Sequence, residues 1–170
     1  SQTIAFNLIY VENDSAVDSF GLYIQSATGA ATIAANNTII GVGEKTGNSF
    51  GIRRIRSDLT LKNNIFYNLE TGQNLQNNGT EANTDDYNLL YDCDTNYLGS
   101  WTPGSNNITD SDPLVSSSGR LQSSSPCIDA GVWVSGVNDI GQTDIAGKKT
   151  YGLPDIGAFE RLPFSGNRSV

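Results

Sequence analysis

The sequence predicts an all-β protein in which successive coils of the chain stack as parallel strands. Three observations indicate this fold class: similar segments recur every 25 to 30 residues, apolar side chains alternate with polar ones within them, and no segment shows the 3.6-residue period of a helix. Strands this short cannot bury an apolar face alone. Neighbouring coils must therefore cover one another, at about 4.8 Å per coil.

The main repeat joins residues 33–40 (IAANNTII) to residues 59–66 (LTLKNNIF), 26 positions later. Residues 5–9 (AFNLI) fit the same template upstream, 30 positions before the second copy. Residues 86–90 (DYNLL) fit it downstream, about 25 positions after the third copy. The template therefore predicts four rungs of one parallel sheet.

A second track supports the first, because residues 19–23 (SFGLY) recur 30 positions later as residues 49–53 (SFGIR). Two independent tracks with the same offset indicate coils rather than chance similarity. Clusters of Gly, Asn, Ser and Asp lie between the tracks, for example at residues 71–74 (TGQN), and predict corners and loops.

An asparagine occupies the same place in each repeat, and we expect its side chain to point inward. The series is Asn7, Asn37, Asn63 and Asn88. Stacked amides would hydrogen-bond to the coils above and below, which satisfies polar groups that are otherwise costly to bury. The alternative is that they are ordinary turn residues. Alternation that continues through the asparagine favours an asparagine ladder.

The repeat fades after about residue 92. This divides the chain into β-helical coils over residues 1–92 and a loop-rich C-terminal cap over residues 93–170. Residues 93–128 are polar and rich in turn formers. An irregular wrap over the last coils and a flexible linker would both explain this composition, and we expect the wrap.

Four motifs occur in order in the C-terminal part: DPLV at 112–115, LQSSSPCIDAG at 121–131, TDIAG at 143–147 and PDIGAFE at 154–160. Together they resemble the choice-of-anchor Q domain, which closes many secreted bacterial β-helix proteins. The rung sequences NNTI, NNIF and YNLLY resemble the end of a pectate-lyase-like β-helix.

The resemblance implies a right-handed, single-stranded parallel β-helix of about three to four coils with an irregular C-terminal closing region. It also implies a secreted or cell-surface protein of bacterial type. It implies no particular reaction, because this superfamily includes polysaccharide lyases, hydrolases and epimerases, and a fold does not settle a function.

Composition excludes several classes of function. The chain of 170 residues has no histidine, which removes Ser/His/Asp and Cys/His triads and HExxH zinc sites. Its net charge of −8 argues against binding to nucleic acid, which needs clustered Lys and Arg. No stretch approaches about 18 consecutive apolar residues, so we expect no membrane insertion. The acidic surface, rich in Ser, Thr, Asn and Gly, is typical of extracellular proteins.

The two cysteines, Cys93 and Cys127, are 34 positions apart and neither belongs to a CxxC motif. A disulfide between them would stabilise the fold by about 3 kcal/mol or somewhat more in the chain-entropy model. Two buried free thiols are the alternative.

A basic run forms a candidate substrate-binding ledge. Its members are Arg53, Arg54, Arg56 and Lys62, with Tyr23 from the preceding coil. Register places Arg53 outward on Tyr23, an arrangement suited to a cation–π contact. A bulge after the preceding isoleucine would bring Arg54 and Arg56 to the surface as well.

Arginine reads carboxylates bidentately, so this ledge would suit an acidic polysaccharide carrying uronate or sulfate groups. In a lyase, one cation would neutralise the uronate while an Arg or Lys removed the adjacent proton. The alternative is simple pairing with surface carboxylates such as Asp58 and Glu44.

An acidic group is a candidate metal site. It contains Asp85, Asp86, Asp92 and Asp94. Asp92 and Asp94 would share one face of a strand at about 7 Å, near the separation found in inverting glycosidases. The same oxygens could instead hold Ca²⁺, and solvated turn aspartates are the third interpretation.

Three further aspartates, Asp129, Asp144 and Asp155, each stand shortly before a glycine in the C-terminal motifs. We interpret them as structural residues that accept backbone N–H bonds in tight turns. A structural calcium among them is the alternative.

These features predict an extracellular β-helix module that serves as a scaffold or adhesion element and contacts polysaccharide, with no complete active site in this chain. One alternative is a fragment of a polysaccharide lyase. Another is a filament subunit, because an open N-terminal rung could pair with a second copy. The same rung could also continue covalently into upstream coils, since residues 1–11 already have the pattern of a strand.

Overall fold

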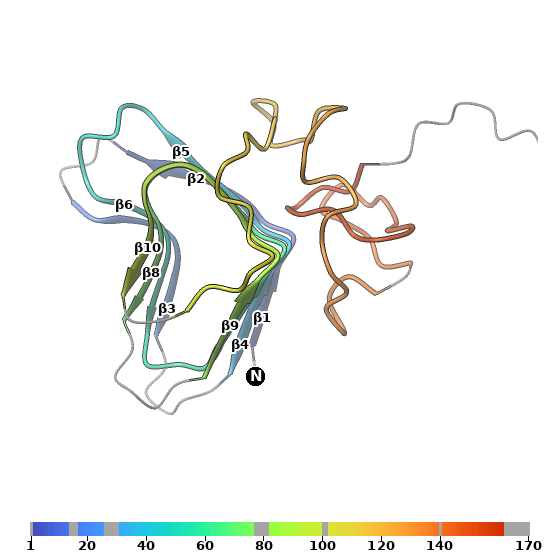
Figure 1. Ribbon diagram of the computed structural model, residues 1–170, viewed down its shortest axis with the longest axis horizontal. Coiled ribbons are helices and arrows are strands. Elements are labelled where there is room, and N and C mark those ends of the chain that lie inside the picture. Colours follow the sequence, from blue (N-terminus) through green and yellow to red (C-terminus); the bar gives the residue numbers. More distant parts are fainter. Residues whose placement is uncertain are drawn as a thin grey trace, which may run out of the picture.

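The computed structural model is an all-β parallel β-helix, which confirms the predicted fold class (Figure 1). It describes residues 2–13, 17–25, 31–76, 82–99, 102–139 and 141–161. The strands are β1 (Gln2–Ala5), β2 (Leu8–Glu12), β3 (Ser19–Gln25), β4 (Thr32–Ala35), β5 (Thr38–Val42), β6 (Ser49–Ile55), β7 (Leu59–Lys62), β8 (Ile65–Gln76), β9 (Asn83–Asp86) and β10 (Leu89–Gly99). The described residues contain no helix.

Two parallel sheets form the walls of the β-helix. Sheet A has the order β1-β4-β7-β9, so the chain completes about three turns. Sheet B has the order β2-β5-β8-β6-β3, with β10 paired to β8. Strand β8 pairs with β5 near its start and with β6 near its end, so sheet B bends round a corner of the β-helix (Figure 1).

The coils shorten along the chain. Equivalent residues of sheet A are Gln2, Thr32, Leu59 and Asn83, which are offset by 30, 27 and 24 residues. The predicted offset of 30 is confirmed on both tracks, since Ser19 pairs with Ser49. The predicted offset of 26 for the next coil is wrong by one residue.

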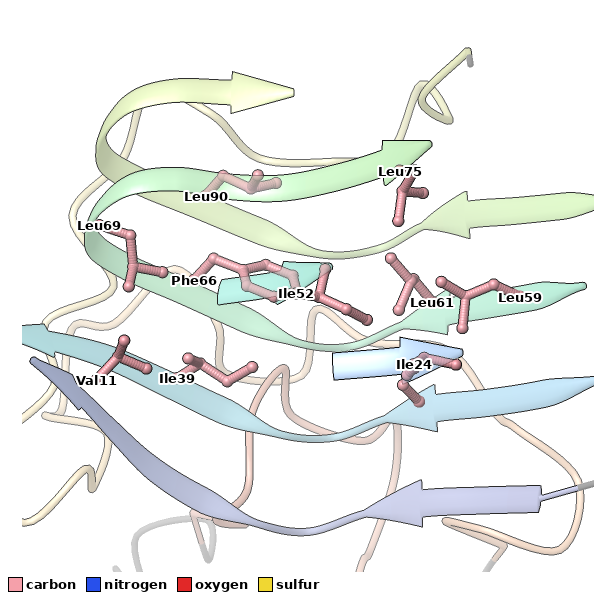
Figure 2. Close-up of a cluster of buried hydrophobic side chains, with 11 residues drawn as sticks. Val11, Ile24, Ile39, Ile52, Leu59, Leu61, Phe66, Leu69, Leu75 and Leu90 are labelled. Carbon is pink, nitrogen blue, oxygen red and sulfur yellow. The ribbon is translucent and has the colours of Figure 1, made fainter. Parts of the chain in front are cut away.

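Inward side chains fill the space between the walls with one continuous apolar core (Figure 2). Its buried members are Val11, Ile24, Ala34, Ile39, Ile52, Leu59, Leu61, Phe66, Leu69, Leu75 and Leu90. They come from every coil, so each coil covers the apolar face of its neighbour. This is the burial that short strands could not achieve alone.

A stack of glycines explains the repeated SFG sequence. Gly21, Gly51 and Gly72 lie above one another, and a Cβ on Gly51 would come within 2.5 Å of the Gly72 carbonyl oxygen. A Cβ on Gly21 would meet the Gly51 carbonyl oxygen at 2.6 Å. Only glycine permits this approach between coils.

An asparagine ladder follows the corner between sheet A and the first half of sheet B. Side-chain Nδ2 groups donate to the Oδ1 of the next coil, from Asn7 to Asn37 at 2.8 Å, from Asn37 to Asn64 at 2.9 Å and from Asn64 to Asn88 at 2.9 Å. A longer contact of 3.4 Å extends the series to Asn107. The predicted ladder therefore exists, and it is one rung longer than predicted.

The prediction that Asn63 belongs to the ladder is wrong. Asn63 has a left-handed φ of 57°. The equivalent residues of the other coils are also left-handed, with φ between 53° and 59° for Phe6, Asn36 and Tyr87. Asparagine tolerates this conformation better than most residues. At this position the side chain leaves the core: the amide of Asn63 accepts from Val132 N at 2.9 Å and donates to Val132 O at 2.7 Å.

The C-terminal residues pack against the outside of this same corner (Figure 1). Asn36 donates to the Asp155 carbonyl at 3.1 Å, and Thr38 Oγ1 accepts from Ala158 N at 2.9 Å. Apolar contacts support these bonds, with one cluster built on Ile65, Leu89, Cys127 and Ile156 and another on Ala35, Val134 and Val137. The described part of this region thus packs along the outside of the β-helix.

Buried carboxylates hold the turns of the wrap. Asp144 accepts the N–H groups of Ala146, Lys148 and Glu160 at 2.7 to 2.8 Å. Asp155 accepts those of Asp129 at 2.8 Å and Arg161 at 2.5 Å. The structural interpretation is confirmed for Asp144 and Asp155, whereas Asp129 has a left-handed φ of 52° and is exposed.

Candidate functional site

A projecting loop distinguishes the second coil from the third. Twelve positions separate Thr38 from Phe50, but only six separate their partners Ile65 and Thr71 in the next coil. The extra residues of the second coil form the loop at residues 43–48, between β5 and β6. Strands β8 and β10 turn the corner without such a loop. The loop at residues 43–48 therefore projects past them and stands beside them.

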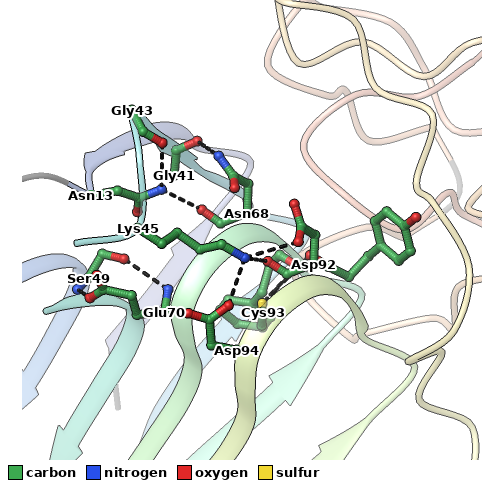
Figure 3. A network of polar contacts seen from close by, with 12 residues as sticks. Asn13, Gly41, Gly43, Lys45, Ser49, Asn68, Glu70, Asp92, Cys93 and Asp94 are labelled. Atoms are coloured by element: carbon green, nitrogen blue, oxygen red, sulfur yellow. Dashed lines mark hydrogen bonds and ion pairs between the residues drawn. The ribbon is translucent and has the colours of Figure 1, made fainter. Parts of the chain in front are cut away.

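Lys45 ties this loop to β10 (Figure 3). Its Nζ lies 3.0 Å from Asp92 Oδ1 and 2.9 Å from Asp94 Oδ1, and it also donates to the Asp92 carbonyl at 3.0 Å. Burial alone would lower the pKa of Lys45, but the hydrogen bonds and charges of Asp94 and Asp92 outweigh it and raise the pKa. Lys45 therefore stays protonated and fixes the loop.

A second polar stack supports the base of the loop (Figure 3). Asn13 Nδ2 donates to the Asn68 carbonyl at 2.9 Å, and Asn68 Nδ2 donates to the Gly41 carbonyl at 2.8 Å. No simple spacing in the sequence reveals this stack, because Asn13 and Asn68 are not in equivalent positions of the repeat.

An open hollow of about 330 Å³ lies between the loop and the middle of β8 and β10. Its lining residues are Lys45, Thr46, Gly47, Asn48, Phe50, Glu70, Thr71, Asp94 and Thr95. Glu70 is held in place, because its carboxylate accepts from Ser49 N and its own N–H donates to Ser49 Oγ at 3.0 Å. The hollow therefore offers fixed carboxylates, hydroxyls and one ammonium group beside an aromatic ring.

Phe50 joins this hollow to an aromatic ridge, which we define as Phe20, Tyr23, Phe50 and Arg53. The rings of Phe20 and Phe50 stack at 5.3 Å with 19° between their planes, one coil apart. Tyr23 is tilted against Phe20 at 5.3 Å and is 49% exposed. Arg53 lies 5.5 Å from the Phe20 ring centroid and 5.8 Å from that of Phe50.

The predicted basic ledge is assembled only in part. Arg53 does stand opposite Tyr23 in register, but its cation–π contacts are with Phe20 and Phe50. Its ion-pair partner is Asp18, at 3.1 Å, rather than Asp58 or Glu44. Register was therefore predicted correctly and the partners were not.

The prediction that Arg54 reaches the surface is wrong. Alternation continues without a bulge, so Arg54 points inward next after Ile52, is fully buried and donates to Asn83 Oδ1 at 2.6 Å. Arg56 directly follows β6 and is exposed to solvent. Lys62 lies on the other sheet, sheet A, opposite Asp86. The four basic residues thus do not form one surface.

The predicted acidic group is also divided. Asp85 is buried inside the β-helix, where it accepts from Asn88, Asn107 and Gln73 at 2.5 to 3.2 Å. Burial raises its pKa to about 6 despite these hydrogen bonds. Asp86 instead accepts from Asn106 N and Nδ2, both at 2.9 Å.

Asp92 and Asp94 do share one face, as predicted, but both are occupied by Lys45. In the part of the chain that the structure describes, no group of three or more His, Cys, Asp or Glu could hold a metal ion. The predicted calcium set, Asp85 with Asp86, Asp92 and Asp94, is therefore not brought together.

Both cysteines are free thiols, so the disulfide alternative is wrong. Cys93 packs against the core inside the walls, whereas Cys127 is buried outside sheet B with Ile65 and Leu89. The wall between the two thiols keeps them apart. Burial raises the pKa of each to about 12.

No family model, no curated protein and no solved structure matches this chain. Among the described residues there is no helix of the length and apolarity needed to cross a membrane. Fold and local chemistry therefore carry the functional argument: the structure defines a parallel β-helix with a lateral hollow and an adjoining aromatic ridge.

Proposed function

We propose that this protein is an extracellular, cell-surface β-helix module that acts as a scaffold or adhesion element and contacts polysaccharide. The observation that carries the proposal is the aromatic ridge continuing through Phe50 into the hollow. The resemblance of the C-terminal motifs to the choice-of-anchor Q domain of secreted, pectate-lyase-like β-helix proteins supports this proposal.

A saccharide suits this surface chemically. Sugar rings present apolar C–H faces, which pack on aromatic rings, and hydroxyls that both donate and accept hydrogen bonds. Phe20 and Tyr23 supply the first kind of contact on the ridge. Glu70, Thr71 and Thr95 supply acceptors and hydroxyls in the hollow. A chain of sugars laid across both would use every one of these groups.

Charge favours a neutral polysaccharide over an acidic one. Around the hollow, the carboxylates of Glu70, Asp92 and Asp94 face the single ammonium group of Lys45. On the ridge, Arg53 is already paired with a carboxylate. A uronate would therefore meet net negative charge, which opposes binding. We accordingly place acidic sugars second to neutral ones as ligands.

The lyase alternative receives less support from the geometry. Arg54, one of its candidate bases, is fully buried, and Lys45 has a raised pKa where a base would need a lowered one. Incubation with polygalacturonate should give no increase in the ultraviolet absorbance of unsaturated uronates. Turnover that Arg53→Gln abolishes would favour the lyase instead.

Affinity electrophoresis in gels containing a soluble polysaccharide tests the proposal. Xylan and a soluble cellulose derivative serve as neutral ligands, and polygalacturonate serves as the acidic one. We expect retardation by a neutral polymer and a weakening of about tenfold in Phe20→Ala, since one aromatic contact is lost.

Tyr151→Ala is the matched control, because Tyr151 is 59% exposed in the C-terminal region, outside the ridge and the hollow. Its mobility should follow that of the wild type. The proposal would be contradicted if no polymer slowed the wild-type protein. It would also be contradicted if Tyr151→Ala lost as much retardation as Phe20→Ala.

The scaffold role has a structural counterpart at the N-terminal rung. Strands β1, β2 and β3 are the terminal strands of their sheets among the described residues, so their outer backbone groups can pair with upstream coils or with another copy. Sedimentation that shows association at high concentration would favour filament assembly, and a monomer at all concentrations would contradict it.

A further inference from the structure

Three basic side chains from separate segments of the C-terminal region meet around one small hollow. Arg120, Lys148 and Arg161 line it together with Leu121, Phe159 and Glu160. Its volume is about 70 Å³. The chain has only ten basic residues against eighteen acidic ones, so three basic residues at one point are a marked local reversal of charge.

The backbone that carries these side chains is held by the buried carboxylates of the wrap. Asp144 accepts the N–H of Lys148 at 2.7 Å and that of Glu160 at 2.8 Å. Asp155 accepts the N–H of Arg161 at 2.5 Å. Two of the three basic residues are therefore fixed at their backbone before any ligand arrives, which reduces the entropy lost on binding.

The third basic residue is fixed through its side chain. The guanidinium carbon of Arg120 lies 4.6 Å from the centroid of the Phe159 ring, over its face. A cation–π contact of this kind orients the planar fork while leaving its N–H donors free of carboxylates.

Within the described residues, the direct ion pairs belong to Lys45 and Arg53, and none involves Arg120, Lys148 or Arg161. Arg161 has a longer-range attraction to the Asp155 carboxyl, which offsets part of the rise in pKa that burial causes in that group. Among the described residues that line the hollow, Glu160 alone carries a carboxyl group, and it is 6% exposed. Burial, with the charges of Asp155, Asp144 and Asp129 added, raises the pKa of Glu160 to about 8, so this group is mostly protonated near neutral pH.

We infer that Arg120, Lys148 and Arg161 form a binding site for a tetrahedral oxyanion, a sulfate or phosphate group. Three positive charges balance a dianion better than the single charge of a carboxylate. Two guanidinium forks and one ammonium group supply donors from several directions, which suits a tetrahedral group. At about 30 Å³ per water molecule, the volume of about 70 Å³ corresponds to about two water molecules, so the hollow is of the size for one small anion.

Isothermal titration at constant ionic strength tests this site with sodium sulfate, sodium phosphate, glucose 6-sulfate and glucose. Saturable binding of inorganic sulfate would show a site for the free ion. Tighter binding of glucose 6-sulfate would assign the site to a sulfate group on a larger molecule. Glucose should not bind, because the site recognises the oxyanion. Heats that do not saturate with any oxyanion would overturn the inference.

Substitutions locate the site. Lys148→Gln and Arg161→Gln should each weaken sulfate binding by about tenfold or more, since each removes a charge-assisted hydrogen bond. Lys149→Gln is the matched control, because its side chain does not line the hollow, and its affinity should be unchanged. Equal weakening in all three variants would reveal only general screening and would overturn the inference.

The pH dependence supplies an independent readout. Groups facing the Glu160 carboxyl are Asp155, Asp144 and Asp129, with Arg120, Lys148 and Arg161 around the hollow. As pH rises from 7 to about 9, Glu160 loses its proton and adds a negative charge, so sulfate affinity should fall several-fold. Glu160→Gln should remove this fall. If the sulfate affinity of Glu160→Gln fell with rising pH as steeply as that of the wild type, the assignment of charge at the site would be contradicted.

Discussion

Replacing Asn64 with alanine removes the central member of the asparagine ladder. Its Nδ2 donates to Asn88 Oδ1 and the Ala34 carbonyl, each at 2.9 Å, and to the Lys62 carbonyl at 3.1 Å. Its Oδ1 accepts from Asn37 N at 3.1 Å and from Asn37 Nδ2 at 2.9 Å. Asn64 is 1% exposed, so water cannot readily replace these partners.

The cost follows from which groups lose their partner. The Asn37 backbone N–H is left without its acceptor inside the protein, which costs about 1 to 3 kcal/mol. Asn37 Nδ2 loses Asn64 Oδ1 as its acceptor but still donates to the Ile4 carbonyl. Asn88 Oδ1 loses Asn64 Nδ2 as its donor but still accepts from Asn64 N. Each of these two lost hydrogen bonds therefore costs nearer to about 1 kcal/mol. The total is about 3 to 5 kcal/mol. That is a large part of the stability of a typical domain.

Urea unfolding of the wild type and of Asn64→Ala measures this difference. Asn7→Ala provides a comparison within the ladder, because Asn7 lies at its end, is half-buried and should cost about 1 kcal/mol. Asn106→Ala is the exposed control, and its loss should be smaller still. A loss in Asn64→Ala no greater than that in Asn7→Ala would refute the reasoning that the ladder satisfies buried polar groups.

Other predictions concern Glu160, the cysteines and two glycines. Because the folded pKa of Glu160 is raised to about 8 from its usual 4.5, the native state keeps a proton that the unfolded state has lost between these values. Stability should therefore fall with rising pH across that window by at most about 1.4 kcal/mol per pH unit from this group, and urea unfolding of Glu160→Gln should show a smaller fall. Cys93 and Cys127 should react with a thiol reagent only slowly in the native protein and fully in urea, and the intact mass should show two reduced thiols. A thiol that reacts fast in the native state would argue against their burial. Gly157→Ala should lower the stability by more than about 2 kcal/mol, because the φ of Gly157 is 109° and a Cβ there would lie 2.7 Å from Ile65 Cδ1. Gly136→Ala places its Cβ in open space and should cost only about 1 kcal/mol, from the φ of 75°. Equal losses of stability in thermal unfolding would contradict the close packing of the C-terminal wrap.

The fold was predictable because its signal is local and repeated. Alternating apolar residues at a spacing of 30 identified the coils, and the SFG repeat marks the point where glycines of adjacent coils approach closely. The register of the third coil was not settled by the pair Asn63-Asn64, since either asparagine fits the pattern. The pairs Phe6-Asn7 and Tyr87-Asn88 carried the missing signal: only their second residue is asparagine, so the second position is the ladder.

The sites were less predictable because they depend on contacts between coils. A basic residue at an inward position contradicts the apolar pattern, and Arg54 is accommodated there by Asn83, a residue of the next coil. The hollow arises from a difference in length between two coils, which becomes visible only once Thr38 is matched with Ile65. Arg120 and Arg161 come from an irregular region without a period, so no spacing rule could have brought them together.

The central claim is that polysaccharide lies along the aromatic ridge and enters the adjoining hollow. The most direct test is residue-resolved nuclear magnetic resonance of the protein during titration with a neutral oligosaccharide. We expect chemical-shift changes concentrated at Phe20, Tyr23, Phe50 and Arg53 and at the lining of the hollow. Changes confined to the C-terminal region, or no changes with any oligosaccharide at saturating concentration, would contradict the claim.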